Sequence, residues 1–219
     1  MKSTVWRVYA GVLLVGLGLL LLLQNLGVFQ AGANFEAMLF GAVFILGGLA
    51  FLAVLFTNRT SWWAAIPGIT LCSIGILIFV SALLPALGEM IGGAIVLGGV
   101  SLSFWVIFFL DNRNWWAIIP AGTLLTLAVI SVLPPYLTGG NGFIVPAVLF
   151  TGLGLTFALL GIIMSGQGRR WGWSWIPACI LIIMGLIFAF TAYNLTQIIW
   201  PAILILVGLY LVFRSVRKS

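Results

Sequence analysis

The stretch Asn58-Arg59-Thr60-Ser61-Trp62-Trp63 returns about 53 residues later as Asp111-Asn112-Arg113-Asn114-Trp115-Trp116, and both copies separate long apolar runs. Each copy combines polar turn residues with one arginine and a pair of tryptophans. Arginine and tryptophan beside an apolar run of about 20 residues are typical of the boundary between lipid and cytoplasm. The two stretches therefore predict loops between membrane-spanning helices, and their recurrence predicts repeated spans.

The composition indicates a protein whose solvent is lipid. Of its 219 residues, 63% are hydrophobic and 5% are charged, whereas a soluble domain has about 25% charged residues. The alternating pattern of a transmembrane barrel is absent from the sequence, so helices are the expected spanning structure. We predict an all-α integral membrane protein with eight transmembrane helices, at about 8–28, 36–56, 62–84, 90–110, 115–134, 143–164, 173–192 and 196–213.

The first apolar run precedes Ala31-Gly32-Ala33 and so resembles a signal peptide with its cleavage site. Its length exceeds that of a usual signal-peptide core, and it aligns with later spans of the repeat. We therefore expect it to be retained as a helix.

Self-similarity at about 53–57 residues predicts four direct tandem helical hairpins within a single membrane domain 1–219, with repeats at about 1–59, 60–113, 114–170 and 171–219. Alternate spans open with a tryptophan followed four residues later by a proline or small residue: Trp6 and Ala10, Trp63 and Pro67, Trp116 and Pro120, Trp173 and Pro177. Direct repeats differ from the inverted repeats of many ion-coupled transporters. They predict a bundle with rotational or translational symmetry about the membrane normal.

Basic residues mark one side of every predicted hairpin. All nine lysines and arginines lie at the termini or in alternate loops, at Lys2, Arg7, Arg59, Arg113, Arg169, Arg170, Arg214, Arg217 and Lys218. The positive-inside bias then places both termini in the cytoplasm.

Tryptophans accompany these basic residues. We expect headgroup anchors at Trp6, Arg7, Arg59, Trp62, Trp63, Arg113, Trp115, Trp116, Arg169, Arg170, Trp171, Trp173, Trp175 and Arg214. The predicted partners are membrane lipids, anionic on the cytoplasmic face. Trp105, within a span, and Trp200, near the outer face, are the exceptions.

Small residues at helix-pairing spacing are a second group of candidates. They are Gly88, Gly92, Gly93, Gly98, Gly154 and Ala158. Such residues let helix backbones approach closely in lipid. They fit packing within the bundle and equally a surface for a membrane-protein partner.

The residues that usually carry chemistry are scarce. The chain has no histidine, two cysteines that fall within predicted spans, and three carboxylates, Glu36, Glu89 and Asp111, at predicted helix ends. We expect Asp111 to pair with Arg113. An ionisable residue inside the membrane would be a functional candidate, and the predicted spans contain none. We therefore expect no catalytic, cofactor-binding or metal-binding residue, no enzyme activity and no nucleic-acid partner.

Two segments carry a resemblance to a known family. The string Trp200-Pro201-Ala202-Ile203-Leu204-Ile205-Leu206-Val207-Gly208-Leu209-Tyr210, and Gly16-Leu17-Gly18 with Gln24-Asn25-Leu26-Gly27, resemble the last and first helices of bacterial LiaI/LiaF-like transmembrane regions. The resemblance implies a bacterial cytoplasmic (inner) membrane protein related to envelope-stress signalling, in which family members restrain or inform a membrane sensor kinase.

Two functions remain open at this stage. The first is a non-enzymatic multi-pass protein that acts by contact, as an accessory, scaffolding or sensor-modulating subunit. The alternative is a small-solute channel or transporter. Convergence of the hydroxyls of Thr70, Ser101, Thr123 and Thr151 on one water-accessible cavity would favour the alternative, and a dry, close-packed centre would oppose it.

Overall fold

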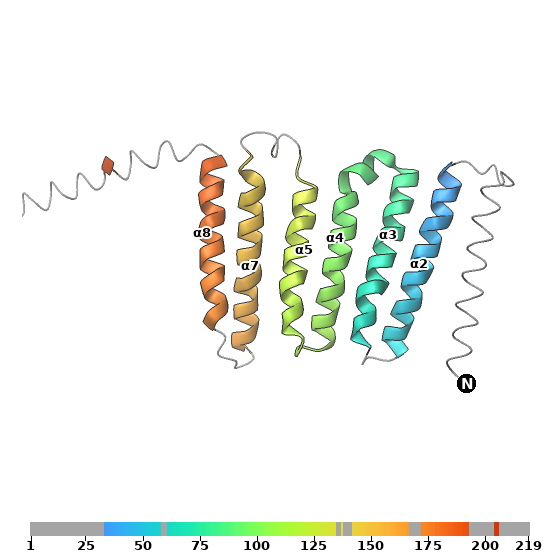
Figure 1. Ribbon diagram of the computed structural model, residues 1–219, viewed down its shortest axis with the longest axis horizontal. Helices are drawn as coiled ribbons and strands as arrows, with labels where there is room; N and C mark the ends of the chain where they lie inside the picture. The colour runs from blue at the N-terminus through green and yellow to red at the C-terminus, as the bar shows by residue number, and fades with distance from the viewer. Residues whose placement is uncertain are drawn as a thin grey trace, which may run out of the picture.

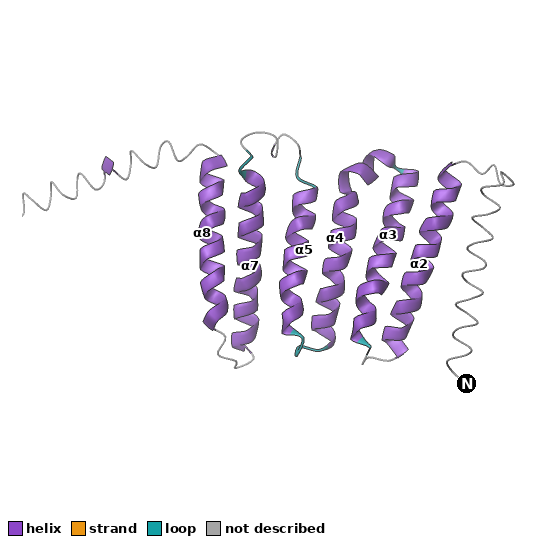
Figure 2. Ribbon diagram, in the orientation of Figure 1, coloured by secondary structure: helices purple, strands orange, loops and turns teal. Residues whose placement is uncertain are grey.

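A computed structural model describes residues 33–57, 61–134, 137, 142–166, 172–192 and 204–205. Six α-helices occupy most of this part: α2 (Ala33–Thr57), α3 (Ala65–Leu83), α4 (Pro85–Leu110), α5 (Ile118–Ser131), α7 (Ile144–Gly166) and α8 (Trp175–Ala192). Three short 3-10 helices lead directly into α3, α5 and α8: η1 (Trp62–Ala64), η2 (Trp115–Ala117) and η3 (Gly172–Ser174). Helix is the one regular secondary structure among these residues (Figure 2).

The described helices stand side by side in a single row (Figure 1). Each α-helix packs extensively against the α-helices before and after it in the row. Successive helices run in opposite directions, so α2, α4 and α7 end at the edge where α3, α5 and α8 begin (Figure 1). The row therefore has two broad faces and two edges, and its described helices do not surround a common centre.

Five helical segments are long and apolar enough to cross a membrane: Asn34–Thr57, Trp62–Leu83, Pro85–Leu110, Ile144–Gly166 and Gly172–Ala192. The prediction of an all-α, multi-pass membrane protein is therefore confirmed by the length and composition of these helices. The predicted spans 8–28 and 196–213 lie outside the described residues, apart from Leu204 and Ile205. The total of eight helices and the four hairpins stay predictions.

The span predicted at 115–134 ends earlier than expected. Its helical segment is Trp115–Ser131, which is shorter than the five long spans. Val132 leaves the helical conformation with φ −104° and ψ 3°, ahead of Pro134 and Pro135. Proline disfavours helical geometry in the residue before it and removes a backbone donor. At 1.5 Å per residue the segment is about 25 Å long, slightly less than a hydrocarbon core of about 30 Å.

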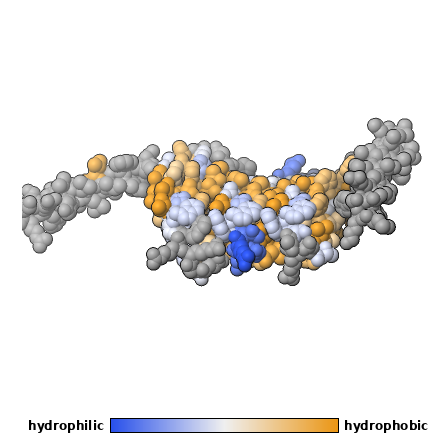
Figure 3. Space-filling view, turned by 60° about the horizontal axis from the view of Figure 1, so that its bottom comes forward, coloured by the Kyte–Doolittle hydropathy of each residue, from blue (hydrophilic) through white to orange (hydrophobic). Residues whose placement is uncertain are grey.

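The best-buried side chains gather toward the edge at which α3, α5 and α8 begin. This core contains Leu55, Ala64, Ala65, Ile107, Phe108, Ala117, Ile118, Leu160 and Met164. Away from it the two faces of the row are covered by exposed apolar side chains. In the space-filling view the flank is hydrophobic, and more polar side chains gather along this edge (Figure 3). This distribution fits a row whose faces contact lipid tails and whose edge lies at the headgroups.

Candidate functional site: the tryptophan edge, the helix seams and an apolar groove

Similar turns build the edge that we call the tryptophan edge, after Trp62, Trp63, Trp115, Trp116, Trp173 and Trp175. Ser61 precedes η1 with φ −86° and ψ 46°, and Asn114 precedes η2 with φ −81° and ψ 44°. The Ala64 amide donates to the Ser61 carbonyl at 3.0 Å, and the Ala117 amide donates to the Asn114 carbonyl at 3.0 Å. A proline then follows early in each helix, at Pro67, Pro120 and Pro177, where the missing amide proton costs little.

A phenylalanine and a tryptophan join each tight helix pair at this edge. The pairs are Phe51 with Trp63 (centroids 6.3 Å apart, rings at 77°), Phe104 with Trp116 (6.1 Å, 80°) and Phe157 with Trp173 (6.2 Å, 70°). Edge-to-face contacts of this kind contribute about 0.5–1.5 kcal/mol beyond area burial. They join the end of α2, α4 or α7 to the start of the next helix.

The tryptophan rings are half packed and half exposed. The exposed fractions of Trp63 and Trp173 are 52% and 47%. Trp62 and Trp116 contact each other with centroids 5.9 Å apart, which links η1 to η2. An aromatic ring with one packed and one open side suits the headgroup region. The other predicted anchors, Trp6, Arg7, Arg59, Arg169, Arg170, Trp171 and Arg214, lie outside the described residues.

Arg113 lies at the tryptophan edge, in the turn between α4 and η2. Its backbone amide donates a hydrogen bond to Asp111 Oδ1 at 2.9 Å. The contact between these two residues is therefore a side-chain-to-backbone turn of the kind that aspartate commonly makes. It closes the turn without engaging the guanidinium group.

One close crossing recurs in the three helix pairs that meet at the tryptophan edge. Between α2 and α3, a Cβ built at Gly48 would lie 2.6 Å from the Gly68 carbonyl oxygen. At the corresponding place between α4 and α5, Ser101 Oγ donates to the Ala121 carbonyl at 2.7 Å. Between α7 and α8, a Cβ built at Gly154 would lie 3.1 Å from the Ala178 carbonyl oxygen. Small residues thus let each pair of backbones approach at the same level.

A second crossing recurs in the seams between these pairs. Gly99 of α4 faces the Ser73 side chain of α3, and Gly152 of α7 faces the Thr126 side chain of α5. The Ser73 and Thr126 hydroxyls each donate to a carbonyl of their own helix at 2.8 Å. Their polar atoms are therefore satisfied without a partner across the seam.

Most of the small residues that the sequence predicted for helix packing face a neighbouring helix. The predicted residues are Gly88, Gly92, Gly93, Gly98, Gly154 and Ala158. A Cβ at Gly88 or Gly92 would meet side chains of α3, one at Gly93 would meet Ser131 of α5, and one at Gly154 would meet α8. These four face neighbours within the same chain. Gly98 has nothing within 4 Å of a Cβ position, and Ala158 is partly buried.

Of the residues that define the crossings, Gly154 was among the predicted candidates, whereas Gly48, Gly68 and Ser101 were not, because the candidates were small residues four positions apart. The crossings follow a spacing of seven: Gly41 and Gly48, Gly68 and Gly75, Ala121 and Ala128, Ala178 and Gly185. Gly41 lies opposite Gly75, since a Cβ at Gly75 would lie 2.7 Å from the Gly41 carbonyl oxygen. A search at the heptad period would have found this signal.

The four hydroxyls named for a channel lie on four different helices. Ser101 donates across to α5, Thr123 donates to the Ile119 carbonyl of its own helix, and Thr151 contacts Gly185 of α8. The Thr70 hydroxyl of α3 is buried without a hydrogen-bond partner. These side chains do not converge on one cavity.

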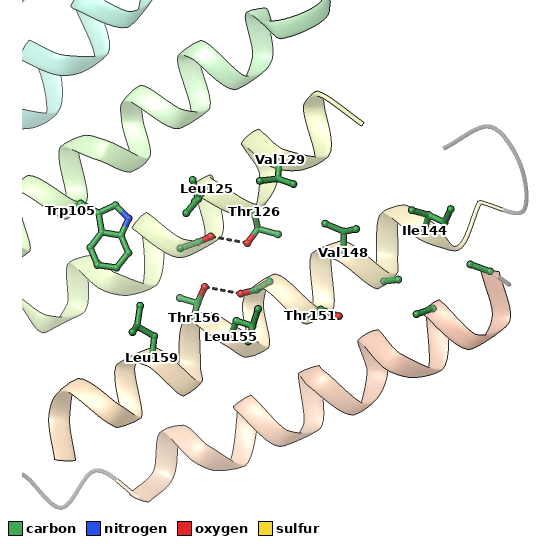
Figure 4. A pocket seen from close by; sticks show the side chains of 15 residues that line it. Trp105, Leu125, Thr126, Val129, Ile144, Val148, Thr151, Leu155, Thr156 and Leu159 are labelled. Atoms are coloured by element: carbon green, nitrogen blue, oxygen red, sulfur yellow. Dashed lines mark hydrogen bonds between the residues drawn. The ribbon is translucent and has the colours of Figure 1, made fainter. Parts of the chain in front are cut away.

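An open groove of about 530 Å³ runs along the seam between α5 and α7 (Figure 4). Space is left because several residues along it are small: Gly122, Ala147, Gly152, Ala189 and Ala192. Trp105 of α4 and Leu159 lie at one end, and Ile144 lies at the other (Figure 4). Apolar side chains form most of the remaining lining.

Comparisons with known proteins found nothing similar: no protein-family model, curated protein or solved structure matches the chain. Among the described residues, no group of three or more His, Cys, Asp or Glu side chains is arranged to hold a metal ion. The features that bear on function are therefore the helix row, its edge and its groove.

Proposed function

We propose that this protein acts by contact in the membrane, as a non-enzymatic accessory, scaffolding or sensor-modulating subunit. The observation that carries the proposal is the single row of described helices. A row presents two broad apolar faces at the same depth as the spans of other membrane proteins. Exposed residues such as Leu46 of α2 and Leu102 of α4 belong to these faces, with exposed fractions of 65% and 54%.

The polar groups of the described seams support contact over conduction. The Ser73, Thr126 and Thr156 hydroxyls donate to carbonyls of their own helices at 2.8 Å. Ser101 donates to the neighbouring helix. A solute pathway needs polar groups that face a shared space, whereas these hydroxyls are used within the helix row.

The proposal includes the full topology that the sequence predicts. We infer eight helices in four direct hairpins, with both termini cytoplasmic. The recurring turns at η1 and η2, the three Phe–Trp pairs and the repeated crossings support the repeat. The charge bias of the loops supports the orientation. The tryptophan edge would then face the cytoplasm and its arginines would attract anionic lipid headgroups.

The resemblance to LiaI/LiaF-like transmembrane regions supports a bacterial inner membrane and a partner involved in envelope-stress signalling. It rests on residues of the first and last predicted spans. A membrane sensor kinase is the partner class that this resemblance implies.

Site-directed photocrosslinking in living cells tests the contact function. A photoreactive amino acid is placed at Leu46 or Leu102, on exposed positions, and at the fully buried Ile107 as the matched control. We expect a defined crosslinked membrane protein from an exposed position and none from Ile107. Crosslinks to lipid alone from both exposed positions would contradict the proposal.

A flux assay tests the alternative. Purified protein in liposomes should pass glycerol and potassium no faster than protein-free liposomes do. Flux above that background, abolished by Thr151→Trp, would refute the contact function and establish a pathway.

A further inference from the structure

The groove between α5 and α7 is long enough to hold a hydrocarbon chain. It extends from Ile144 to Leu159 along α7, which is about 22 Å at 1.5 Å per residue. The groove has a volume of about 530 Å³ and is open to the surface. Carbon atoms in contact lie about 3.5–4.0 Å apart, so a row of methylene groups is narrow enough to lie along it.

A protein helix is too large for the same space. With its side chains a helix is about 10–12 Å across, so about 22 Å of helix fills at least about 1,700 Å³, more than three times the volume of the groove. A second copy of this chain or a partner's span could cover the groove but could not lie within it.

We propose that an acyl chain of a bilayer phospholipid occupies this groove as a bound lipid. The chain enters at the end marked by Ile144, which lies at the edge opposite the tryptophans, and descends toward Trp105 (Figures 1 and 4). About 22 Å exceeds the roughly 15 Å that one leaflet contributes to a hydrocarbon core about 30 Å thick. The groove is therefore long enough for the full depth of one tail from the leaflet opposite the tryptophan edge.

The chemistry of the lining fits a hydrocarbon. Thr126 Oγ1 donates to the Gly122 carbonyl and Thr156 Oγ1 donates to the Gly152 carbonyl, each at 2.8 Å (Figure 4). Both hydroxyl protons are thus engaged within their own helices, so neither threonine needs a polar partner in the groove. An apolar void that stayed empty would forfeit dispersion contacts along its whole wall, and lipid tails are available to fill it.

Trp105 gains a role in this arrangement. Unlike the tryptophans that define the tryptophan edge, it lies inside a helix, five residues before the end of α4. Its ring stacks on Phe109 with centroids 5.8 Å apart and planes at 24°, which fixes the wall that ends the groove (Figure 4). A rigid aromatic wall sets how far the acyl chain can penetrate.

Photoactivatable phosphatidylcholine tests the site, with a diazirine in the middle of one acyl chain. The full-length protein is reconstituted with this lipid, irradiated and mapped by mass spectrometry. Val129 and Leu155 line the groove, and Ile76 and Leu102 are matched controls one repeat earlier on the α3 and α4 helices. The exposed fractions of Val129 and Ile76 are both 47%, and those of Leu155 and Leu102 are 58% and 54%.

We expect labelling at Val129 and Leu155 to exceed labelling at the two controls by about fivefold, which corresponds to about 1 kcal/mol. Equal labelling at the groove and at the controls would overturn the proposal. Crosslinks from groove residues to a second polypeptide in place of lipid would also overturn it.

Two variants complete the test. Ala189→Phe places a ring into the groove from α8, whereas Leu186→Phe changes an exposed residue of the same helix that does not line it. Labelling of the groove should fall to the control level in Ala189→Phe and stay unchanged in Leu186→Phe. Retained labelling in a folded Ala189→Phe protein would refute the site. If Ala189→Phe does not fold, Leu155→Phe is read out at Val129 by the same criterion.

Discussion

Replacing Gly48 by alanine should weaken the seam between α2 and α3. A Cβ at this position would lie 2.5 Å from Cys72 Sγ and 2.6 Å from the Gly68 carbonyl oxygen. Side-chain carbons in proteins rarely approach a backbone oxygen within about 3.0 Å, so the two helices must separate by at least about 0.4 Å. The carbonyl belongs to a helix backbone and cannot move aside alone.

The expected magnitude follows from a comparison with Gly98→Ala. Both glycines lie in the middle of a long helix, so both substitutions gain the same helix propensity, up to about 1 kcal/mol. A Cβ at Gly98 meets nothing within 4 Å. Overpacking a closely fitted contact costs about 1–3 kcal/mol. The free energy of unfolding of Gly48→Ala should therefore lie about 1–3 kcal/mol below that of Gly98→Ala.

Unfolding in mixed micelles, followed by circular dichroism, measures this difference. The thiols supply a second readout, because Cys72 is partly buried at the seam and Cys179 is exposed on α8. Gly48→Leu should accelerate alkylation of Cys72 and leave Cys179 unchanged. Equal stability of Gly48→Ala and Gly98→Ala would show that the close crossing between α2 and α3 is wrong.

Three further predictions test other parts of the structure. Ser101→Ala removes an interhelical hydrogen bond of 2.7 Å and should lower the free energy of unfolding in micelles by about 0.5–1.5 kcal/mol; no loss would argue against the α4–α5 register. Phe157→Leu should lower the free energy of unfolding by about 0.5–1.5 kcal/mol, and most of this loss should be absent in a protein that already carries Trp173→Leu. Additive losses from the two substitutions would show that the rings do not interact. Reporter fusions after Ala33 and after Ser219 should report opposite compartments, and a shared compartment would disprove the proposed topology.

The helices were predictable because lipid imposes a simple length rule on them. Apolar runs near 20 residues gave bounds close to those of α2, α3, α4, α7 and α8. The early end of α5 was not predicted because the apolar run continues through Val132 and Leu133, although the helix ends before the prolines that follow. Local backbone geometry determines that boundary, and hydropathy does not contain this information.

The edge was more predictable than the seams. Tryptophan, arginine and polar turn residues together mark an interface by composition alone, and the rings of Trp62 and Trp116 indeed contact each other. The lateral order of the helices could not be inferred in the same way. These helices are apolar on all sides, so no polar stripe indicates which face meets protein and which meets lipid.

The groove could not be predicted, since it depends on how two seams differ. Gly99 opposite Ser73 and Gly152 opposite Thr126 are corresponding crossings, yet the large groove lies along the second. The lining there includes Ala189 and Ala192 of α8 and the ring of Trp105 from α4. Contributions from four helices to one space are not encoded in any short motif.

The single row of helices also determines how a substitution in one seam affects the stability of the whole protein. In such an array each helix contacts its nearest neighbours, so stability is close to a sum of separate seam energies. Lipid supplies no hydrophobic drive for helices to associate, so each seam depends on close approach through residues such as Gly48, Ser101 and Gly154. The seam between α5 and α7 carries an open groove with a mostly apolar lining. A lipid tail bound there would replace missing protein contacts and make the strength of this seam depend on the surrounding membrane.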